Sequence, residues 1–125
     1  MWKYYNPNPH GQQAGDCAVR AICAATGKPW DEVYLDLCLC GLLHGDWGSN
    51  NAVWGNYLKK LGYKRDVVPN TCPDCYTVKN FCDDHRHGIY VLAVPNHVVA
   101  VVDGCYVDTW DSGNETPFYY FCKEE

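Results

Sequence analysis

The chain has 125 residues, of which 47% are hydrophobic and 20% charged, and its formal net charge is −5. This length and composition suit one globular domain over residues 1–125 with a modest core. Lys and Arg are scattered through the sequence, and the acidic balance argues against a nucleic-acid partner. No segment approaches the roughly 18 apolar residues of a membrane helix, and the N-terminus lacks the apolar run of a signal peptide. We therefore expect a cytoplasmic protein with no membrane partner.

Helices are expected in the first two thirds of the chain, after an Asn-, Pro- and Gly-rich opening of extended or turning backbone. The first helix has Asp16 as its N-cap and Gly27 just past its C-terminus. The apolar residues of the second recur at helical spacing and include Cys38, and Thr77 caps the fourth. The expected helices cover residues 16–27, 28–43, 50–62 and 77–88, with a short strand over 63–69.

The sequence becomes rich in β-formers from position 88, with strands expected within 88–95, 97–110 and 116–124. Asp103-Gly104 is a strong signal for a two-residue hairpin turn inside the second of these segments. That turn would place Val102 opposite Cys105. Because helices precede strands, we predict an α+β fold in which N-terminal helices pack on a C-terminal antiparallel β-sheet.

Cys17 stands at the start of the first expected helix. Positive potential at a helix N-terminus favours a thiolate, and the backbone N–H there can bind an oxyanion. The chain has nine cysteines, an odd number, so not all can pair within it. Without a secretion signal we expect reduced thiols, with a disulfide framework as the alternative. Cys17 is thus a candidate nucleophile, although a cysteine at a helix start is more often structural.

A base for this thiol is sought among five histidines, and His97 is distinctive because it begins an expected strand. With the two-residue turn, Asp108 lies on the same sheet face as His97 and is diagonally displaced from it. With a three-residue turn, Asp111 would stand opposite instead. A neighbouring carboxylate would fix the tautomer of His97 and favour its imidazolium form.

The segments "GDCAVRAI" and "HVVAVVDG…VDTW" together resemble the papain-like cysteine peptidase superfamily, from about Asn6 to Trp110. The "NPNP…GDC" and "DTWDSG" motifs resemble those of small superfamily members from bacteria and their phages. The resemblance implies a compact papain-like fold, no cofactor, and hydrolysis of a peptide or isopeptide bond in a peptide or protein substrate. It implies Cys17 as nucleophile, His97 as base, Asp108 as its partner, and Trp110 as a shield for that pair.

The oxyanion donor departs from the superfamily pattern, which places a Gln five or six residues before the Cys. Gln12 is five residues before Cys17 and Gln13 is four, so Gln12 fits better, and the segment with Asn6 and Asn8 is a further source. Two other functions stay open. The same triad could serve an amidase, a deamidase or an acyl transferase, or the domain could be a catalytically inactive binding module.

A second cysteine cluster has the spacing of a zinc site: Cys72, Cys75, Cys82 and His85, with His87 as an alternative ligand. We nevertheless expect no metal, because Phe81 and Cys82 read as the inward face of an amphipathic helix. The remaining cysteines lie in apolar patterns that indicate packing: Cys23, Cys38, Cys40, Cys105 and Cys122.

Overall fold

The computed structural model describes residues 1–69 and 74–123, which form a six-stranded sheet and four helices. The helices are α1 (Cys17–Thr26), α2 (Trp30–His44), α3 (Asn51–Lys60) and α4 (Val78–Asp84). The strands are β1 (Trp2–Tyr4), β2 (Tyr63–Val67), β3 (Ile89–Val94), β4 (His97–Val102), β5 (Cys105–Asp108) and β6 (Tyr119–Lys123), in the sheet order β1-β5-β4-β3-β6-β2. The α+β expectation is confirmed.

The sheet is mixed, which corrects the expectation of an antiparallel sheet. β1 pairs in parallel with β5, with Trp2 opposite Tyr106. No element was predicted for the residues of β1, which precede the Asn-, Pro- and Gly-rich segment that begins at Asn6. A strand of three residues carries almost no local signal, and its partner lies at the other end of the chain, so the pairing depends on tertiary structure.

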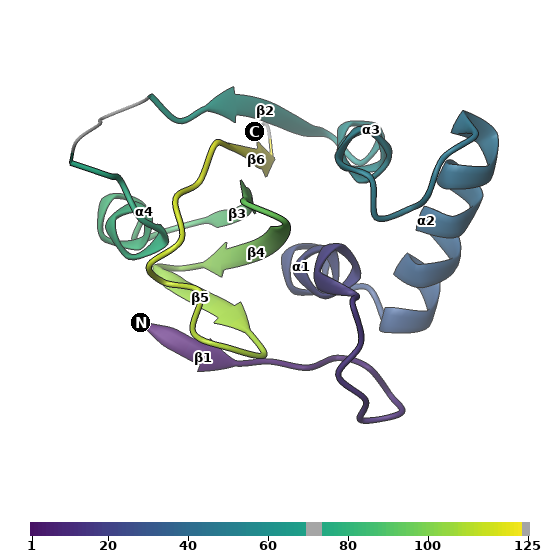
Figure 1. Cartoon of the computed structure of the whole chain (residues 1–125), viewed down its shortest axis with the longest axis horizontal. Coiled ribbons are helices and arrows are strands. Elements are labelled where there is room, and N and C mark those ends of the chain that lie inside the picture. Colours follow the sequence, from purple (N-terminus) through teal and green to yellow (C-terminus); the bar gives the residue numbers. More distant parts are fainter. Residues whose placement is uncertain (70–73, 124–125) are drawn as a thin grey trace.

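Helices cover both faces of the sheet. Figure 1 shows α1 against one face, with α2 and α3 beyond it, and α4 on the opposite side. On the α1 side the core contains Ile22 and Trp54, and on the α4 side it contains Phe81 and Leu92. Double coverage explains why β3 and β4 are almost continuously apolar rather than alternating.

The C-terminal end of α1 agrees with the sequence prediction, and the N-terminal cap does not. Gly27 ends the helix in the left-handed conformation, with φ of 74°, as expected of a C-terminal glycine. Asp16 precedes the helix, but its side chain makes no capping hydrogen bond. It bonds Arg20 and Trp30 instead, so the carboxylate is committed to the tertiary structure.

Two other helical expectations need correction. Cys38 on α2 is exposed, not packed, because the buried face of that helix is formed by Val33, Leu37 and Cys40. The fourth helix ends at Asp84 rather than near residue 88. Thr77 does cap its N-terminus, as expected, by accepting a hydrogen bond from the N–H of Asn80.

The β4–β5 hairpin has the expected two-residue turn, and Val102 pairs with Cys105. Asp103 and Gly104 both have positive φ, of 48° and 80°. This is the backbone of a turn that matches the right-handed twist of the flanking strands. The register that the turn sets determines which residue of β5 lies near the start of β4.

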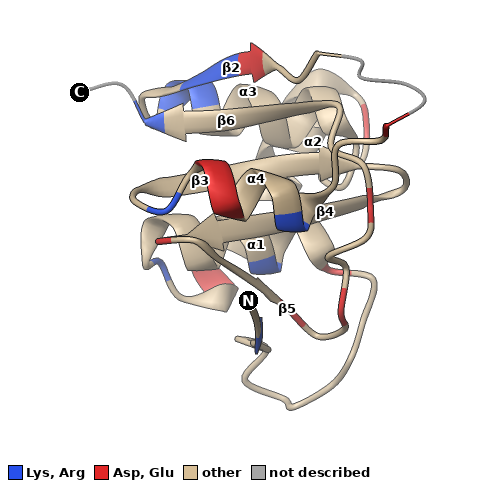
Figure 2. Cartoon of the chain, turned by 90° about the vertical axis from the view of Figure 1, so that its left-hand side faces the viewer, with Lys and Arg blue, Asp and Glu red and all other residues tan. Residues whose placement is uncertain are grey.

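Basic side chains are less scattered in space than in sequence. Lys64 and Arg65 of β2 lie beside the end of β6, where Lys123 pairs with Tyr63 (Figure 2). Two of these cations have partners. Lys64 lies 3.8 Å from the carboxylate of Asp66, and the Arg65 guanidinium lies 4.1 Å from the ring centre of Tyr119. Among the described residues, no helix has the length and apolarity needed to cross a membrane.

Candidate active site

Cys17 and His97 meet because the first turn of α1 packs on the first residue of β4. They line one pocket of about 680 Å³, together with Trp110. The imidazole of His97 and the backbone N–H of Val98 lie beside the Cys17 sulfur, close enough that both lower the pKa of the thiol. A candidate nucleophile and a candidate base therefore contact each other at a helix N-terminus, as the sequence predicts.

His97 is held on its other side by Asp108. Its Nε2 lies 2.6 Å from Oδ2 of Asp108, which leaves Nδ1 as the ring nitrogen that faces Cys17. The side chains of His97 and Asp108 are only 9% and 1% exposed, so water hardly screens their attraction. Asp111, the alternative partner, instead accepts hydrogen bonds from the Tyr106 hydroxyl and the Gly113 N–H.

The electrostatics of these three residues favour an ion pair. Burial opposes ionisation of Cys17, but the hydrogen bonds from His97 and Val98 outweigh it, and the pKa of the thiol lies below its usual value. Burial also opposes protonation of His97, yet Asp108 and Cys17 raise its pKa to about 9. The pKa of Asp108 is lowered despite its burial, because His97 and Ser112 hydrogen bond its carboxylate.

Asp108 has more partners than the sequence analysis anticipated. The Ser112 hydroxyl donates to Oδ2 at 2.8 Å, and the Thr109 N–H donates to Oδ1 at 2.8 Å. Nη2 of Arg20 lies 3.1 Å from Oδ1. Together with His97 these groups bond both oxygens of the carboxylate, which fixes its orientation toward the imidazole.

Arg20 is the residue of this site that sequence reasoning missed. It lies one turn after Cys17 and is buried, with one guanidinium nitrogen on Asp108 and another on Asp16. Asp16 also accepts from Nε1 of Trp30 at 2.9 Å. The available signal was a lone charge among apolar residues in "CAVRAICAA", since a buried arginine requires carboxylate partners.

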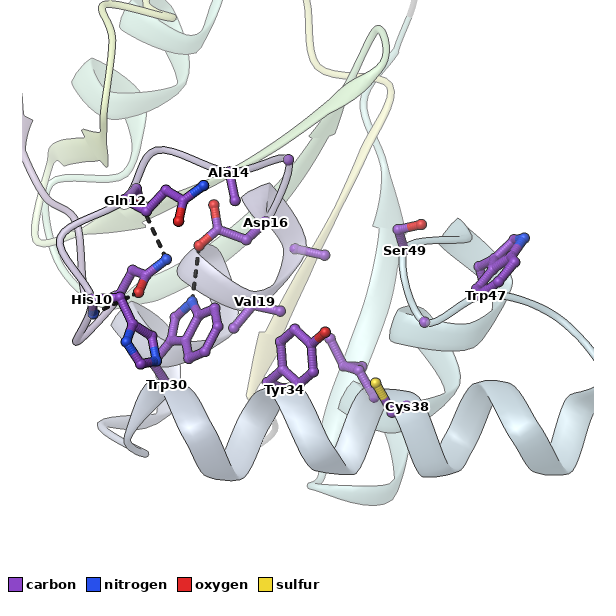
Figure 3. A pocket seen from close by; sticks show the side chains of 15 residues that line it. His10, Gln12, Ala14, Asp16, Val19, Trp30, Tyr34, Cys38, Trp47 and Ser49 are labelled. Carbon is purple, nitrogen blue, oxygen red and sulfur yellow. Dashed lines mark hydrogen bonds between the residues drawn. The ribbon is translucent and has the colours of Figure 1, made fainter.

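The two glutamines lie in different hollows. Gln13 lines the pocket of Cys17, whereas Gln12, favoured by spacing, lines the neighbouring hollow (Figure 3). The side chains of Asn6 and Asn8 both donate to the carbonyl oxygen of Gln12. They therefore shape the loop before α1, and Gln13, rather than Gln12, shares a pocket with Cys17.

Trp110 covers His97 from the solvent side. The centres of the two rings are 4.8 Å apart, at an interplanar angle of 48°. Trp110 as a whole is 42% exposed and lines the pocket of Cys17, so it forms part of the pocket rim as well as a cover. This contact agrees with the shielding role that the resemblance implies for Trp110.

The second cysteine cluster is only partly described, since Cys72 lies outside the described residues. Cys75 is exposed, whereas Cys82 is buried beside Phe81. The ring of His85 stacks on Phe81 with centroids 3.8 Å apart. Within residues 1–69 and 74–123, no group of three or more His, Cys, Asp or Glu is placed to hold a metal ion.

Comparison with known proteins adds no relative to this description. No protein-family model, curated protein or solved structure matches the chain. The functional argument therefore rests on the geometry and electrostatics of the site.

Proposed function

We propose that this protein is a papain-like cysteine hydrolase that cleaves a peptide or isopeptide bond. The observation that carries the proposal is the row of Cys17, His97 and Asp108 at the N-terminus of α1, in which Cys17 and His97 share one pocket and His97 hydrogen bonds Asp108. A nucleophile, a base and a group that orients the base are the three parts that thiol catalysis requires.

In the first step, the Cys17 thiolate attacks the carbonyl carbon of the scissile amide. The new S–C bond pushes the carbonyl electrons onto oxygen, and the backbone N–H of Cys17 stabilises that charge, with Gln13 as the proposed second donor. The imidazolium of His97 then gives its proton to the amide nitrogen. The C–N bond breaks, the amine leaves, and a thioester remains on Cys17.

In the second step, water hydrolyses the thioester. Neutral His97 removes a proton from the water as it attacks, and the S–C bond breaks to release the carboxylic acid. The proton on His97 and the thiolate on Cys17 restore the starting ion pair. Asp108 holds the imidazole in one orientation throughout, and Trp110 limits the access of water to the His97–Asp108 pair.

The reactivity of Cys17 tests this proposal most directly. We expect Cys17 to be labelled first of the nine thiols by sub-stoichiometric iodoacetamide at about pH 6, where ordinary thiols are almost fully protonated. Peptide mapping identifies the labelled site. Cys38 is the internal control, since it is exposed but lies on α2 away from any helix N-terminus. Preferential labelling of Cys38 or Cys105 would contradict the proposal.

The reaction class is tested by intact mass spectrometry with a panel of peptidyl, isopeptidyl and simple acyl probes. Acylation of the native protein, its absence in Cys17→Ala, and release of the acid on standing would support hydrolysis. Transfer of the acyl group to an added amine would instead identify an acyl transferase, and release from a primary amide alone would identify an amidase or deamidase. No acylation by any probe would favour a binding module.

A further inference from the structure

Three hollows adjoin one another along the surface beside α2. The pocket of Cys17 shares Ala14, Gly15 and Ser49 with a second hollow of about 440 Å³. That hollow shares Cys38, Trp47 and Gly48 with a third, of about 510 Å³. We call the second and third hollows together the α2 groove. It leads away from Cys17 and ends beside Leu42 and Gly45.

The α2 groove is mainly apolar and aromatic. Trp30, Tyr34 and Cys38 project into it from α2, and Trp47 lies beyond Cys38 on the loop after that helix (Figure 3). The rings of Trp30 and Tyr34 contact each other, with centroids 4.9 Å apart. Trp47 is 81% exposed and Leu42, in the same hollow, is 76% exposed. Exposed apolar residues that adjoin one another mark an interaction site more often than a single one does.

Two carboxylates stand at the border of the groove, and one of them is paired with a cation. The carboxylate of Asp16 accepts from Arg20 and from the indole N–H of Trp30. Asp46, at the far end, accepts from the backbone N–H of Trp47 at 2.7 Å. Asp16 is therefore paired with a cation, whereas the exposed Asp46 keeps its negative charge at the far end of the groove, and the rest of the lining is mainly apolar.

The position of His97 determines which part of a substrate reaches this groove. The leaving amine must lie next to His97, since that residue supplies its proton. His97, Asn96 and Trp110 line the pocket of Cys17 but are not shared with the α2 groove. The groove joins that pocket through Ala14, Gly15 and Ser49 instead, so we assign it to the acyl part of the substrate.

We propose that the α2 groove binds large apolar or aromatic side chains on the acyl side of an extended peptide substrate. The inference rests on the proposed function and adds a substrate class to it. A volume of about 440 Å³ is within the range of roughly 300–1,000 Å³ typical of ligand sites. The second hollow accommodates one bulky side chain, and the third extends the contact to a further apolar residue.

The preference is measured with acetylated tripeptidyl acyloxymethyl ketones that differ only in the residues preceding the ketone. The Cys17 sulfur displaces the carboxylate leaving group, and intact mass gives the second-order rate constant. We expect probes with Phe, Trp or Leu to react at least about tenfold faster than matched probes with Asp or Gly. Reaction of all probes at one rate, or faster reaction of the Asp probes, would overturn the inference while leaving Cys17 as the nucleophile.

Two exposed side chains near the end of α2 provide a matched pair of variants. Trp47→Ala removes a wall of the groove and should reduce the preference for aromatic probes about fivefold or more. Leu43→Ala removes a side chain that is 70% exposed and is not among the groove residues, so it should leave the preference unchanged. Equal effects of the two substitutions would contradict the assignment.

Cys38 reports occupancy without catalysis, because it lies in the groove and is exposed. In the Cys17→Ala protein, an acetylated Phe-Leu-Phe-Gly peptide amide should slow alkylation of Cys38, whereas an Asp-Gly-Asp-Gly amide should not. This protection does not require hydrolysis. If the peptide protects Cys38 but no probe acylates Cys17 of the native protein, the proposed function is refuted and the binding role of the groove remains. Protection that depends only on protein concentration would assign the groove to a second copy of the chain and overturn the inference.

Discussion

At the scale of single residues, the site is a row of alternating charges. Asp16, Arg20, Asp108 and His97 follow one another through direct contacts in which acidic and basic groups alternate, and Cys17, whose pKa is lowered, lies beside His97 at the end of the row. Each buried charge is adjacent to one of opposite sign, which compensates for its loss of hydration. The ion pair of Cys17 and His97 is therefore the outer end of a network that begins under α2.

The raised pKa of His97 predicts the pH dependence of hydrolysis. The thiolate forms below the usual pH range of a thiol, and the imidazolium persists until pH rises through about 9. The kcat/KM for a peptide amide should therefore rise on the acid side with ionisation of Cys17. It should fall near pH 9, where His97 loses the proton that the leaving amine needs.

Asp108→Asn tests the origin of that profile. The substitution removes the carboxylate whose hydrogen bond raises the pKa of His97, so the alkaline limb should move to lower pH. We expect kcat/KM to fall on the order of a hundredfold at the optimum. Asp111→Asn is the control, since Asp111 bonds Tyr106 and Gly113 rather than His97. An unchanged profile for Asp108→Asn would show that Asp108 does not set the pKa of His97.

Arg20 is expected to act as a positioning residue. Arg20→Leu leaves two buried carboxylates without their shared cation and should lower the free energy of unfolding by about 3–5 kcal/mol. Arg20→Lys keeps the charge but lacks the planar fork that spans Asp16 and Asp108. Arg20→Lys should therefore fold, but its Cys17 should be labelled more slowly at acidic pH than Cys17 of the native protein.

The control for Arg20 is Lys28→Leu. This breaks the partly exposed pair of Lys28 with Glu32, whose atoms are 3.3 Å apart, and should cost less than about 1 kcal/mol. Chemical denaturation and the pH profile of Cys17 alkylation measure the two effects separately. A purely structural role for Arg20 would destabilise the fold without altering that pH profile in Arg20→Lys.

At the scale of elements, the hairpin was predicted because local sequence determines it. The features that depend on long-range contacts were not predicted. The Asp103-Gly104 turn fixes a two-residue register by local backbone geometry, so the contact of Asp108 with His97 followed from sequence. The pairing of β1 with β5 has no local determinant. Trp2 donates from its indole to the Asp108 carbonyl at 3.2 Å, so the unpredicted strand also supports the site.

The same distinction explains the error at Cys38 and the different placement of the two glutamines. Helical spacing located α1 and α2. It does not show which face of α2 packs on the neighbouring helices, and that face leaves Cys38 exposed. Sequence spacing favoured Gln12, whereas the turn at Gly11, with φ of 67°, and the loop after it place Gln13 in the pocket of Cys17. The direction of a side chain in a loop depends on the backbone angles more than on the number of residues that separate it from Cys17.

Gly104→Ala tests the link from turn to site. A side chain at φ of 80° costs about 1–2 kcal/mol, and its Cβ would lie 3.3 Å from the Cα of Arg86. Gly27→Ala imposes a similar backbone cost at φ of 74°, at the far end of α1 with open space around it. Both variants should be destabilised in thermal unfolding, but only Gly104→Ala should slow the labelling of Cys17. Equal labelling rates would mean that the turn stabilises the hairpin without positioning Asp108.

At the scale of the whole molecule, two cores on opposite faces of one sheet hold the elements together. The core on the α1 side contains Ile22 and Trp54, and the core on the α4 side contains Phe81 and Leu92. The six strands draw on both ends of the chain, from Trp2 to Lys123. Since apolar burial extends through both layers, we expect the fold to be stable without a metal.

That expectation predicts how the protein responds to chelation. Cys82, one of the possible zinc ligands, is buried beside Phe81. The ring of His85 stacks on the ring of Phe81, and its Nδ1 lies 2.9 Å from the backbone carbonyl oxygen of Phe81. A zinc site that included Cys82 would have to replace this packing. We expect well under one zinc per purified chain by atomic emission, and a melting temperature unchanged by EDTA. Cys82→Ala should lower that temperature equally with and without added zinc, because it removes a packed side chain. Stoichiometric zinc whose removal unfolds the protein would instead make Cys72, Cys75, Cys82 and His85 a structural metal site.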